Sequence, residues 1–204
     1  MNKGYVILDD LMRASILKGL PNIAYGECIK MHDLIRDMAI DITRVHPFFV
    51  VRAGVGLEVA PKEEEWFKDV ERISLMGNKI EMLSGEHVCP NLSTLFLQGN
   101  WYLKVAHDTF FKHMQILRVL DISNTAIKSL PESVSNLENL CMLSLHGCLQ
   151  LRKLPTIAKL KKLRVLDLVY ASLDELPQGL EALTNLRCLR LSTNKLQSFP
   201  PGIF

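Results

Sequence analysis

The sequence predicts an α/β fold in which short parallel strands line the concave face of a solenoid, preceded by a small, mostly helical segment. Three observations predict it. Apolar residues recur in register, with steps of 22, 25, 23, 23 and 23 residues, at Val70, Leu92, Leu117, Leu140, Leu163 and Leu186. Each recurrence opens a stretch in which apolar residues alternate, as in a half-buried strand. Before residue 45 the apolar spacing becomes that of an amphipathic helix.

Each copy follows the template LxxLxLxx(N/T/C/A)xxφxxLP, where φ is apolar. A repeat of this kind with a period of about 20–29 residues is a leucine-rich repeat. The last two apolar residues of LxxLxL point inward, because side chains alternate along a strand. The predicted inward pairs are Ile73/Leu75, Leu95/Leu97, Leu120/Ile122, Leu143/Leu145, Leu166/Leu168 and Leu189/Leu191.

A turn position follows each strand, where an asparagine amide can bond the backbone of a neighbouring coil. It is occupied by Asn78, Asn100, Thr125, Cys148, Ala171 and Asn194. We expect Thr and Cys to do this less fully, and the coil of Ala171 to be looser. The Leu-Pro or Phe-Pro steps at 130–131, 154–155, 176–177 and 199–200 predict a loosely helical or extended return path. Stacking then joins the leucine columns into one core.

The residues between the inward leucines should form a protein-binding face on the concave side, with exposed anchors and a polar surround. Neighbouring strands lie about 4.8 Å apart, so these positions form continuous columns. The candidate binding residues are Phe96, Gln98, Asp121, Ser123, Ser144, His146, Asp167, Val169, Tyr170 and Arg190. The alternative is that each of these side chains is merely solvated.

Composition excludes several other classes of protein. With 24 Lys+Arg against 22 Asp+Glu, net charge predicts no nucleic-acid partner. Neither a transmembrane segment nor a signal peptide is expected, and the five cysteines fit neither a zinc site nor a disulfide scaffold. Reduced thiols in a cytoplasmic protein are therefore expected. The six histidines are scattered, and no Gly-x-Ser-x-Gly or His-Glu-x-x-His motif occurs, so the chain is not expected to be an enzyme.

The first 45 residues predict a separate unit. Apolar residues in 31–42 fall at offsets 0, 3, 4, 7, 8 and 11, which defines one face of an amphipathic helix. A second helix is expected upstream, ending near Gly19-Leu20-Pro21, with a brief strand at 28–30 between the two. This order is that of a partial winged-helix unit.

The segment Met31-His32-Asp33 followed by Leu-Ile-Arg-Asp-Met-Ala resembles the MHD motif of plant NB-ARC disease-resistance proteins, the nucleotide-binding leucine-rich-repeat receptors. The run from Gly4 to Leu17 is similar to the segment that precedes the motif in that family. The order of parts is similar too, and closest to the coiled-coil subclass. The resemblance implies a fragment of an intracellular plant immune receptor. Residues 1–45 would end the winged-helix subdomain, 46–69 would be a linker and edge cover, and 70–204 would be about six repeats, truncated at the C-terminus.

In that family the motif's histidine contacts the β-phosphate of ADP and holds the receptor off. By resemblance, this role falls on His32, with Asp33 orienting the turn, and it requires the upstream nucleotide-binding domain. The alternative is that both residues simply cap the helix. The sequence contains no Gly-x-x-x-x-Gly-Lys-(Ser/Thr) loop. We therefore expect no cofactor in this chain, and ADP or ATP only in full-length family members.

The leading hypothesis is a non-catalytic interaction and regulatory fragment. Its partner would be a pathogen effector, a modified (guarded) host protein or the receptor's own nucleotide-binding domain, whose switch it would restrain. The alternative is a general cytosolic leucine-rich-repeat adaptor unrelated to immunity. An extracellular ectodomain is disfavoured because the Leu-Pro step precedes the return path, and a switch ATPase would belong to the upstream region.

Overall fold

The computed structural model describes residues 10–14, 17–22, 26–31, 34, 36–38, 40–41, 48–66 and 68–192. The chain divides into two compact units, Met1–His46 and Pro47–Phe204. Each unit is described by itself. His32 and Asp33 lie outside the described residues, so the predicted nucleotide contact is not tested.

The first unit contains an antiparallel hairpin of β1 (Leu17–Asn22) and β2 (Gly26–Met31). The predicted strand at 28–30 is confirmed as part of β2. The end predicted for the upstream helix, near Gly19-Leu20-Pro21, is wrong. Residues 10–13 are helical, but the chain is extended from Leu17 onward because it pairs with β2. Described residues between 34 and 41 are helical, as expected. The winged-helix assignment itself stays a prediction.

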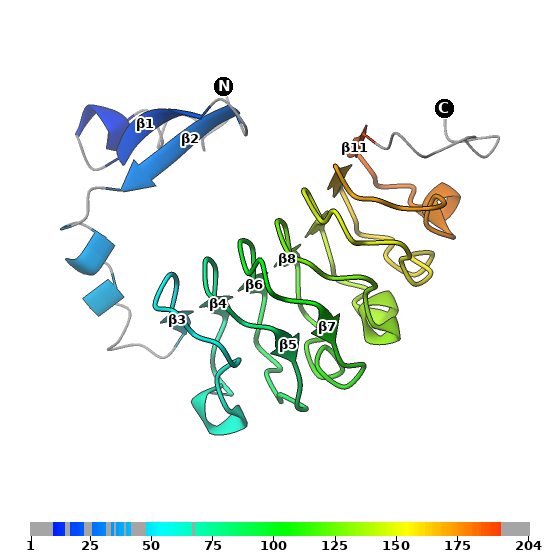
Figure 1. Cartoon of the computed structure of the whole chain (residues 1–204), viewed down its shortest axis with the longest axis horizontal. Helices are drawn as coiled ribbons and strands as arrows, with labels where there is room; N and C mark the ends of the chain where they lie inside the picture. Colours follow the sequence, from blue (N-terminus) through cyan, green and yellow to red (C-terminus); the bar gives the residue numbers. More distant parts are fainter. Residues whose placement is uncertain are drawn as a thin grey trace. The chain divides into compact units, whose positions relative to one another are not determined.

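The second unit is a succession of coils, running from β3 at the left to β11 at the right in Figure 1, whose strands form one parallel sheet on the inner side of the curve. The order of strands in the sheet is β11-β10-β9-β8-β6-β4-β3. Their bounds are β3 Phe49–Val51, β4 Arg72–Ser74, β6 Thr94–Phe96, β8 Val119–Asp121, β9 Met142–Ser144, β10 Val165–Val169 and β11 Cys188–Ser192. The predicted solenoid with its curved parallel sheet is confirmed.

The sheet begins one coil earlier than the leucine template shows. Val50 of β3 pairs in register with Ile73 of β4, and the turn glycine Gly54 donates its N–H to Met76 O at 2.8 Å. β3, which lies in the segment 46–69 expected to be a linker and edge cover, is therefore a strand of the sheet itself. The template misses this coil because valine and arginine stand where the later copies carry leucine.

The return paths lie on the outer side of the second unit. Two short strands, β5 (Met82–Leu83) and β7 (Val105–Ala106), pair in parallel there (Figure 1). Three of the other returns contain 3₁₀ turns, η1 (Glu63–Glu65), η2 (Glu132–Asn136) and η3 (Leu180–Ala182). Pro131 precedes η2 directly, so the Leu-Pro step marks the start of a loosely helical return as expected.

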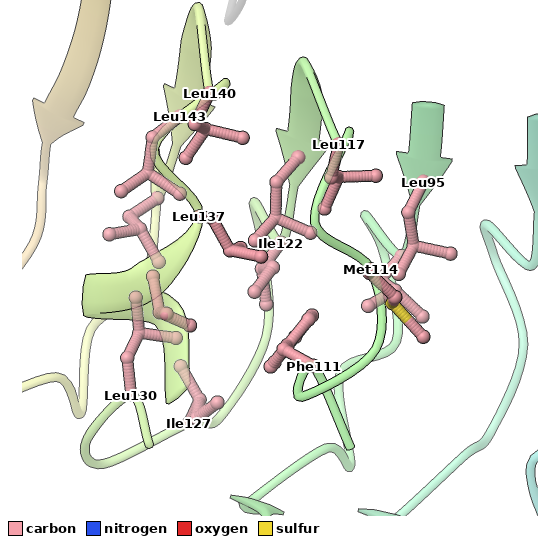
Figure 2. Packing of buried hydrophobic residues seen from close by; sticks show 14 of the residues in the cluster. Leu95, Phe111, Met114, Leu117, Ile122, Ile127, Leu130, Leu137, Leu140 and Leu143 are labelled. Carbon is pink, nitrogen blue, oxygen red and sulfur yellow. The ribbon is translucent and has the colours of Figure 1, made fainter. Parts of the chain in front are cut away.

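The core is a stack of aliphatic columns between the sheet and the returns. Figure 2 shows Leu95, Ile122 and Leu143 from three strand regions facing Phe111 and Leu137 from two return paths. The inward pairs from Ile73/Leu75 to Leu166/Leu168 are buried, whereas Leu189 and Leu191 are only partly buried. Burial of one leucine side chain contributes roughly 1.5–3 kcal/mol, so repetition over the coils accounts for the stability of the stack.

Asparagines tie neighbouring coils together as predicted. The amide of Asn100 donates to Leu75 O at 2.9 Å and Leu97 O at 2.7 Å, and its Oδ1 accepts from Ile80 N–H at 3.2 Å. Thr125 donates to Ile122 O at 3.0 Å, and Cys148 makes a 3.3 Å contact with the same carbonyl. Thr125 and Cys148 therefore make fewer or longer hydrogen bonds to the backbone than Asn100 does, as expected from the residue types. Asn194 lies outside the described residues.

A second asparagine series was not predicted. Asn91, Asn139 and Asn185 donate to the carbonyls of Lys68, Gln115 and Lys161, each one coil earlier, at 3.5, 2.9 and 2.8 Å. The signal in the sequence is the Asn-Leu step that opens these three copies. This series fastens the edge at which the strands begin.

Trp66 belongs to the segment 46–69, for which the sequence predicts a linker and edge cover. It is buried inside the unit, where its indole stacks on His87 at 4.4 Å and meets Phe110 edge-on at 5.7 Å. Its Nε1–H donates to Pro61 O at 2.9 Å. The ring thus fills the core between the first coils. Phe67 lies outside the described residues.

Candidate protein-interaction surface

The parallel register places the predicted binding residues in two columns across the sheet. Phe96, Asp121, Ser144, Asp167 and Arg190 pair successively from β6 to β11. Two positions further along each coil, the column Gln98, Ser123, His146 and Val169 is joined by backbone bonds between the coils: Gly99 N to Ser123 O, Asn124 N to His146 O and Gly147 N to Val169 O. The structure therefore brings all of these positions onto one face.

The middle of this face is a compact polar network. Oδ1 of Asp121 accepts from Ser123 N–H at 2.9 Å and from Ser123 Oγ–H at 2.5 Å. Ser123 Oγ also lies 2.6 Å from Ser144 Oγ on the next coil. Ser123 and Ser144 are buried, whereas Asp121 is half-buried. The two serines thus form the floor of the face and hold the Asp121 carboxylate in place.

A second network surrounds Asp167, which is also largely buried. Its Oδ1 accepts from Val169 N–H at 3.1 Å and lies 3.8 Å from His146 Nδ1. Its Oδ2 lies 3.4 Å from Nη1 of Arg190, whose side chain is 64% exposed. Asp167 is therefore a support for two more exposed side chains.

Tyr170 is the most exposed aromatic residue of this region, at 58%. Its ring meets His146 edge-on with centroids 5.5 Å apart. Its φ of 59° lies in the left-handed region. The matching position in the five preceding coils carries Gly54, Gly77, Gly99, Asn124 and Gly147, all with positive φ. Tyrosine at a position that takes glycine or asparagine in those coils costs on the order of 1–2 kcal/mol, and such strain concentrates at functional sites.

At the other end of the face, Phe96 and Gln98 are half-buried. Gln98 Nε2 lies 3.8 Å from Met76 Sδ, while Gln98 Oε1 and Ser74 Oγ are buried without a hydrogen-bond partner among the described residues. In this part of the face, unlike in the Asp121 network, some buried polar atoms therefore lack a hydrogen-bond partner among the described residues.

The prediction missed a third column on the same face. Arg72, Thr94, Val119, Met142, Val165 and Cys188 pair in register at the start of the strands. They lie two positions before the Phe96 column, so the period-two argument that located that column also locates this one. Val119, Met142 and Val165 are half-buried and give the beginning of the sheet an apolar surface.

This arrangement is suited to binding more than to bond-making chemistry. Ser144, the serine nearest to His146 and Asp167 along the strands, is buried and bonded to another serine. Burial raises the pKa of the Cys89 thiol to about 11 and also raises that of Cys148, which leaves both thiols protonated. Within the part of the chain that is described, no three His, Cys, Asp or Glu side chains are grouped to hold a metal ion.

Comparison with known proteins agrees with this geometry. Residues 108–199 match the family model described as a leucine-rich repeat region. Over 200 residues the chain is 38% identical to the disease resistance protein RFL1 of Arabidopsis thaliana, covering 95% of this chain and 22% of RFL1. It is 40% identical over 201 residues to the probable disease resistance protein At1g61300 of the same plant, covering 96% of this chain and 26% of the relative.

The chain is a homologue of plant disease resistance proteins. It spans about a quarter or less of the length of these relatives. A solved leucine-rich repeat protein of Leptospira interrogans is also similar, with 20% identity, a TM-score of 0.41, and coverage of 80% of this chain and 60% of that chain. Among the described residues of the resistance-protein homologue, no helix has the length and apolar character needed to cross a bilayer.

Proposed function

We propose that this resistance-protein homologue is a non-catalytic protein-interaction and regulatory segment of an intracellular plant immune receptor. Its concave face would recognise a pathogen effector or a modified host protein. The same face would restrain the nucleotide switch of the receptor in the resting state. A ligand that binds the face would then shift the receptor towards its active state, because it competes with the restraining contact.

The observation that supports the proposal is the arrangement of side chains around Asp167 on the concave face. Buried acceptors hold His146 and Arg190, and Tyr170 extends beside them in a strained backbone conformation. Tyrosine and arginine are among the residues that most often dominate binding energy at protein interfaces. Anchors that are already held in place lose less conformational entropy when a partner binds.

The regulatory part of the proposal depends on the resemblance of Met31-His32-Asp33 to the MHD motif. His32 would contact the β-phosphate of ADP, with Asp33 orienting the turn, once an upstream nucleotide-binding domain supplies the phosphate loop. ADP or ATP is then a ligand of the full-length receptor, in the cytoplasm. The high identity to resistance proteins across both units supports this reading.

The test is proximity labelling in leaf cells that express the tagged chain, with and without pathogen challenge. Tyr170→Ala/Arg190→Ala removes the two exposed anchors and leaves the core unchanged. The matched control is Tyr102→Ala/Arg152→Ala, which removes the same residue types from exposed positions away from the two columns.

The proposal expects a set of labelled proteins that depends on challenge, is lost in the anchor variant and is kept in the control. Circular dichroism and thermal unfolding of both purified variants would establish that each is folded. Identical labelling by the wild type and the anchor variant would contradict binding through this face.

A further inference from the structure

Three arginines occupy the same position in different coils, directly before the strand. They are Arg118, Arg164 and Arg187, and all three are exposed. Backbone bonds connect this position from coil to coil: Cys141 N donates to Arg118 O, Arg164 N to Cys141 O and Arg187 N to Arg164 O, at 2.8–2.9 Å. We call these three residues the arginine column. With coils about 4.8 Å apart, the column extends over about 14 Å.

The arginine column differs from the other arginines of the second unit in the contacts that its side chains make. Arg52, Arg152 and Arg190 form salt bridges with Glu65, Asp174 and Asp167. Arg72 lies over the ring of Phe49 at 5.1 Å. Neither a salt bridge nor a side-chain hydrogen bond connects Arg118, Arg164 or Arg187 to any residue that the structure describes. Three guanidinium groups on one edge, with no counter-ion among the described residues, create a local positive field although the chain as a whole is nearly neutral.

An apolar strip lies directly beside the column. Val119, Met142 and Val165 are adjacent across β8, β9 and β10 and are half-buried on the concave face. Val119 follows Arg118 in the chain, and Val165 follows Arg164. Positive charge and apolar surface are thus paired coil by coil along the edge where the strands begin.

The same edge is hollowed. A groove of about 520 Å³ lies there. Its lining residues are Asn91, Ser93, Thr94, Ile116, Arg118, Val119 and Asn139, together with Glu71 and Arg72 of the preceding coil. Ile116 is 42% exposed there. One end of the arginine column and one end of the apolar strip therefore open into a concave site, the shape that ligand sites prefer.

We propose that this edge binds an extended acidic segment of another protein, with carboxylates on the arginine column and apolar side chains on the strip of Val119, Met142 and Val165. Guanidinium groups pair with carboxylates through two parallel N–H···O bonds, so arginine suits this role better than lysine. About four or five residues of extended chain match the length of the column. That length allows two or three carboxylates to be engaged.

The apolar strip favours an acidic protein over a nucleic acid. Asp121 and Asp167 lie on the same strands as the strip, two positions further along, and repel any anionic partner alike. A polyphosphate would leave the apolar side chains unused. A peptide with spaced acidic and apolar residues uses both features.

The test uses the full 204-residue chain and a fluorescein-labelled peptide in which glutamate alternates with leucine, measured by fluorescence anisotropy. Arg164→Glu/Arg187→Glu should weaken binding roughly tenfold or more, and Val165→Thr should weaken it by a smaller factor. The matched charge control is Lys128→Glu/Lys153→Glu, two exposed lysines outside the sheet, which should leave binding unchanged. Raising the salt concentration from about 50 to about 500 mM should weaken binding of the wild type more than that of the arginine variant.

Three results would overturn the proposal: equal loss of binding in the lysine control, equal binding of a peptide with lysine in place of glutamate, or tighter binding of single-stranded DNA that does not respond to Val165→Thr. The proposal goes beyond the proposed function, because it uses a different edge of the sheet. Tyr170→Ala/Arg190→Ala leaves the arginine column intact and should still bind the peptide. Failure of one proposal is therefore distinguishable from failure of the other.

Discussion

The imidazole of His87 stacks on the indole of Trp66, with ring centroids 4.4 Å apart and planes 20° from parallel, inside the core of the first coils. His87 is 3% exposed, and its Nε2–H donates to Ser84 O at 3.1 Å. Its Nδ1 is buried and has no hydrogen-bond partner among the described residues. The ring is therefore held as a neutral aromatic group.

Because His87 is buried as a neutral ring, low pH should destabilise the fold. Burial lowers the pKa of His87 below its ordinary value of 6.5, although the bond to Ser84 O and the charge of Glu63 oppose the shift. Below about pH 6.5 the unfolded chain therefore binds a proton that the folded chain does not. The free energy of unfolding should fall as pH falls from there to the pKa of His87 in the folded state.

His87→Phe keeps an aromatic ring on Trp66 and removes the titration. Denaturant unfolding at about pH 7.5 and about pH 5.5 should show a smaller loss of stability in the variant than in the wild type. The same loss in both proteins would show that His87 does not carry the acid sensitivity.

Asn100 should contribute more to stability than Thr125 at the matching position. Asn100→Ala leaves Leu75 O, Leu97 O and Ile80 N–H without a side-chain partner in a fully buried site, which should cost on the order of 2–4 kcal/mol. Thr125→Val loses one bond to Ile122 O and should cost roughly 1 kcal/mol. Urea unfolding of both variants measures the order, and a Thr125 variant that is the less stable of the two would contradict it.

Sequence reasoning located the solenoid because its signal is periodic. Leu143 and Leu166 occupy the same position in successive copies, and a period of 23 residues leaves few other ways to bury both. It missed the coil of Val50 because that coil lacks the leucines, although it pairs with β4 as the others do. It also misread Leu17–Asn22, where pairing with β2 outweighs the apolar pattern of a helix.

The sequence predicts which residues lie on the candidate surface, but it does not predict which of their side chains are buried or what they contact. Alternation along a strand places Asp121 and Asp167 on the concave face, and they lie there. Which carboxylate is buried depends on side chains of other coils, such as Arg190 over Asp167, and sequence order does not encode those contacts. The strain at Tyr170 could be inferred from the sequence, since the aligned positions carry glycine or asparagine in the five preceding coils.

Leu143→Ala should destabilise the second unit by roughly 2–5 kcal/mol through a cavity in the core. Leu143 is fully buried between coils and pairs in register with Leu120 and Leu166. Its sheet neighbour Asp121 provides the contrast, because Asp121→Asn should preserve the fold and change only the charge of the face. Thermal unfolding compares the two variants, and an equal loss of stability would mean that the Asp121 network is structural.

Nucleotide binding should be undetectable in the 204-residue chain alone. The sequence has no phosphate-binding loop, so nothing in it supplies the backbone N–H cradle that ADP phosphates need. Isothermal calorimetry with ADP and Mg²⁺ should therefore give no heat of binding. Micromolar binding that disappears in His32→Ala would show instead that the Met31-His32-Asp33 segment holds the nucleotide without an upstream domain.

Two glycines with similar backbone conformations should respond differently to alanine. Gly56 has a φ of 79°, and a Cβ there would meet nothing within 4 Å. Gly56→Ala should therefore cost only the strain of the left-handed conformation, about 1–2 kcal/mol. Gly179 has a φ of 86°, but a Cβ there would lie 2.5 Å from the backbone N of Ala158 on the neighbouring coil.

Gly179→Ala must therefore push two return paths apart in addition to straining its own backbone, and backbone atoms cannot move aside as a side chain can. Its cost should reach on the order of 3 kcal/mol or more. Urea denaturation of the two variants in parallel separates strain from crowding, because strain is nearly the same in both. If Gly56→Ala were as destabilising as Gly179→Ala, close contact between the coils at Ala158 would not be what requires glycine at 179.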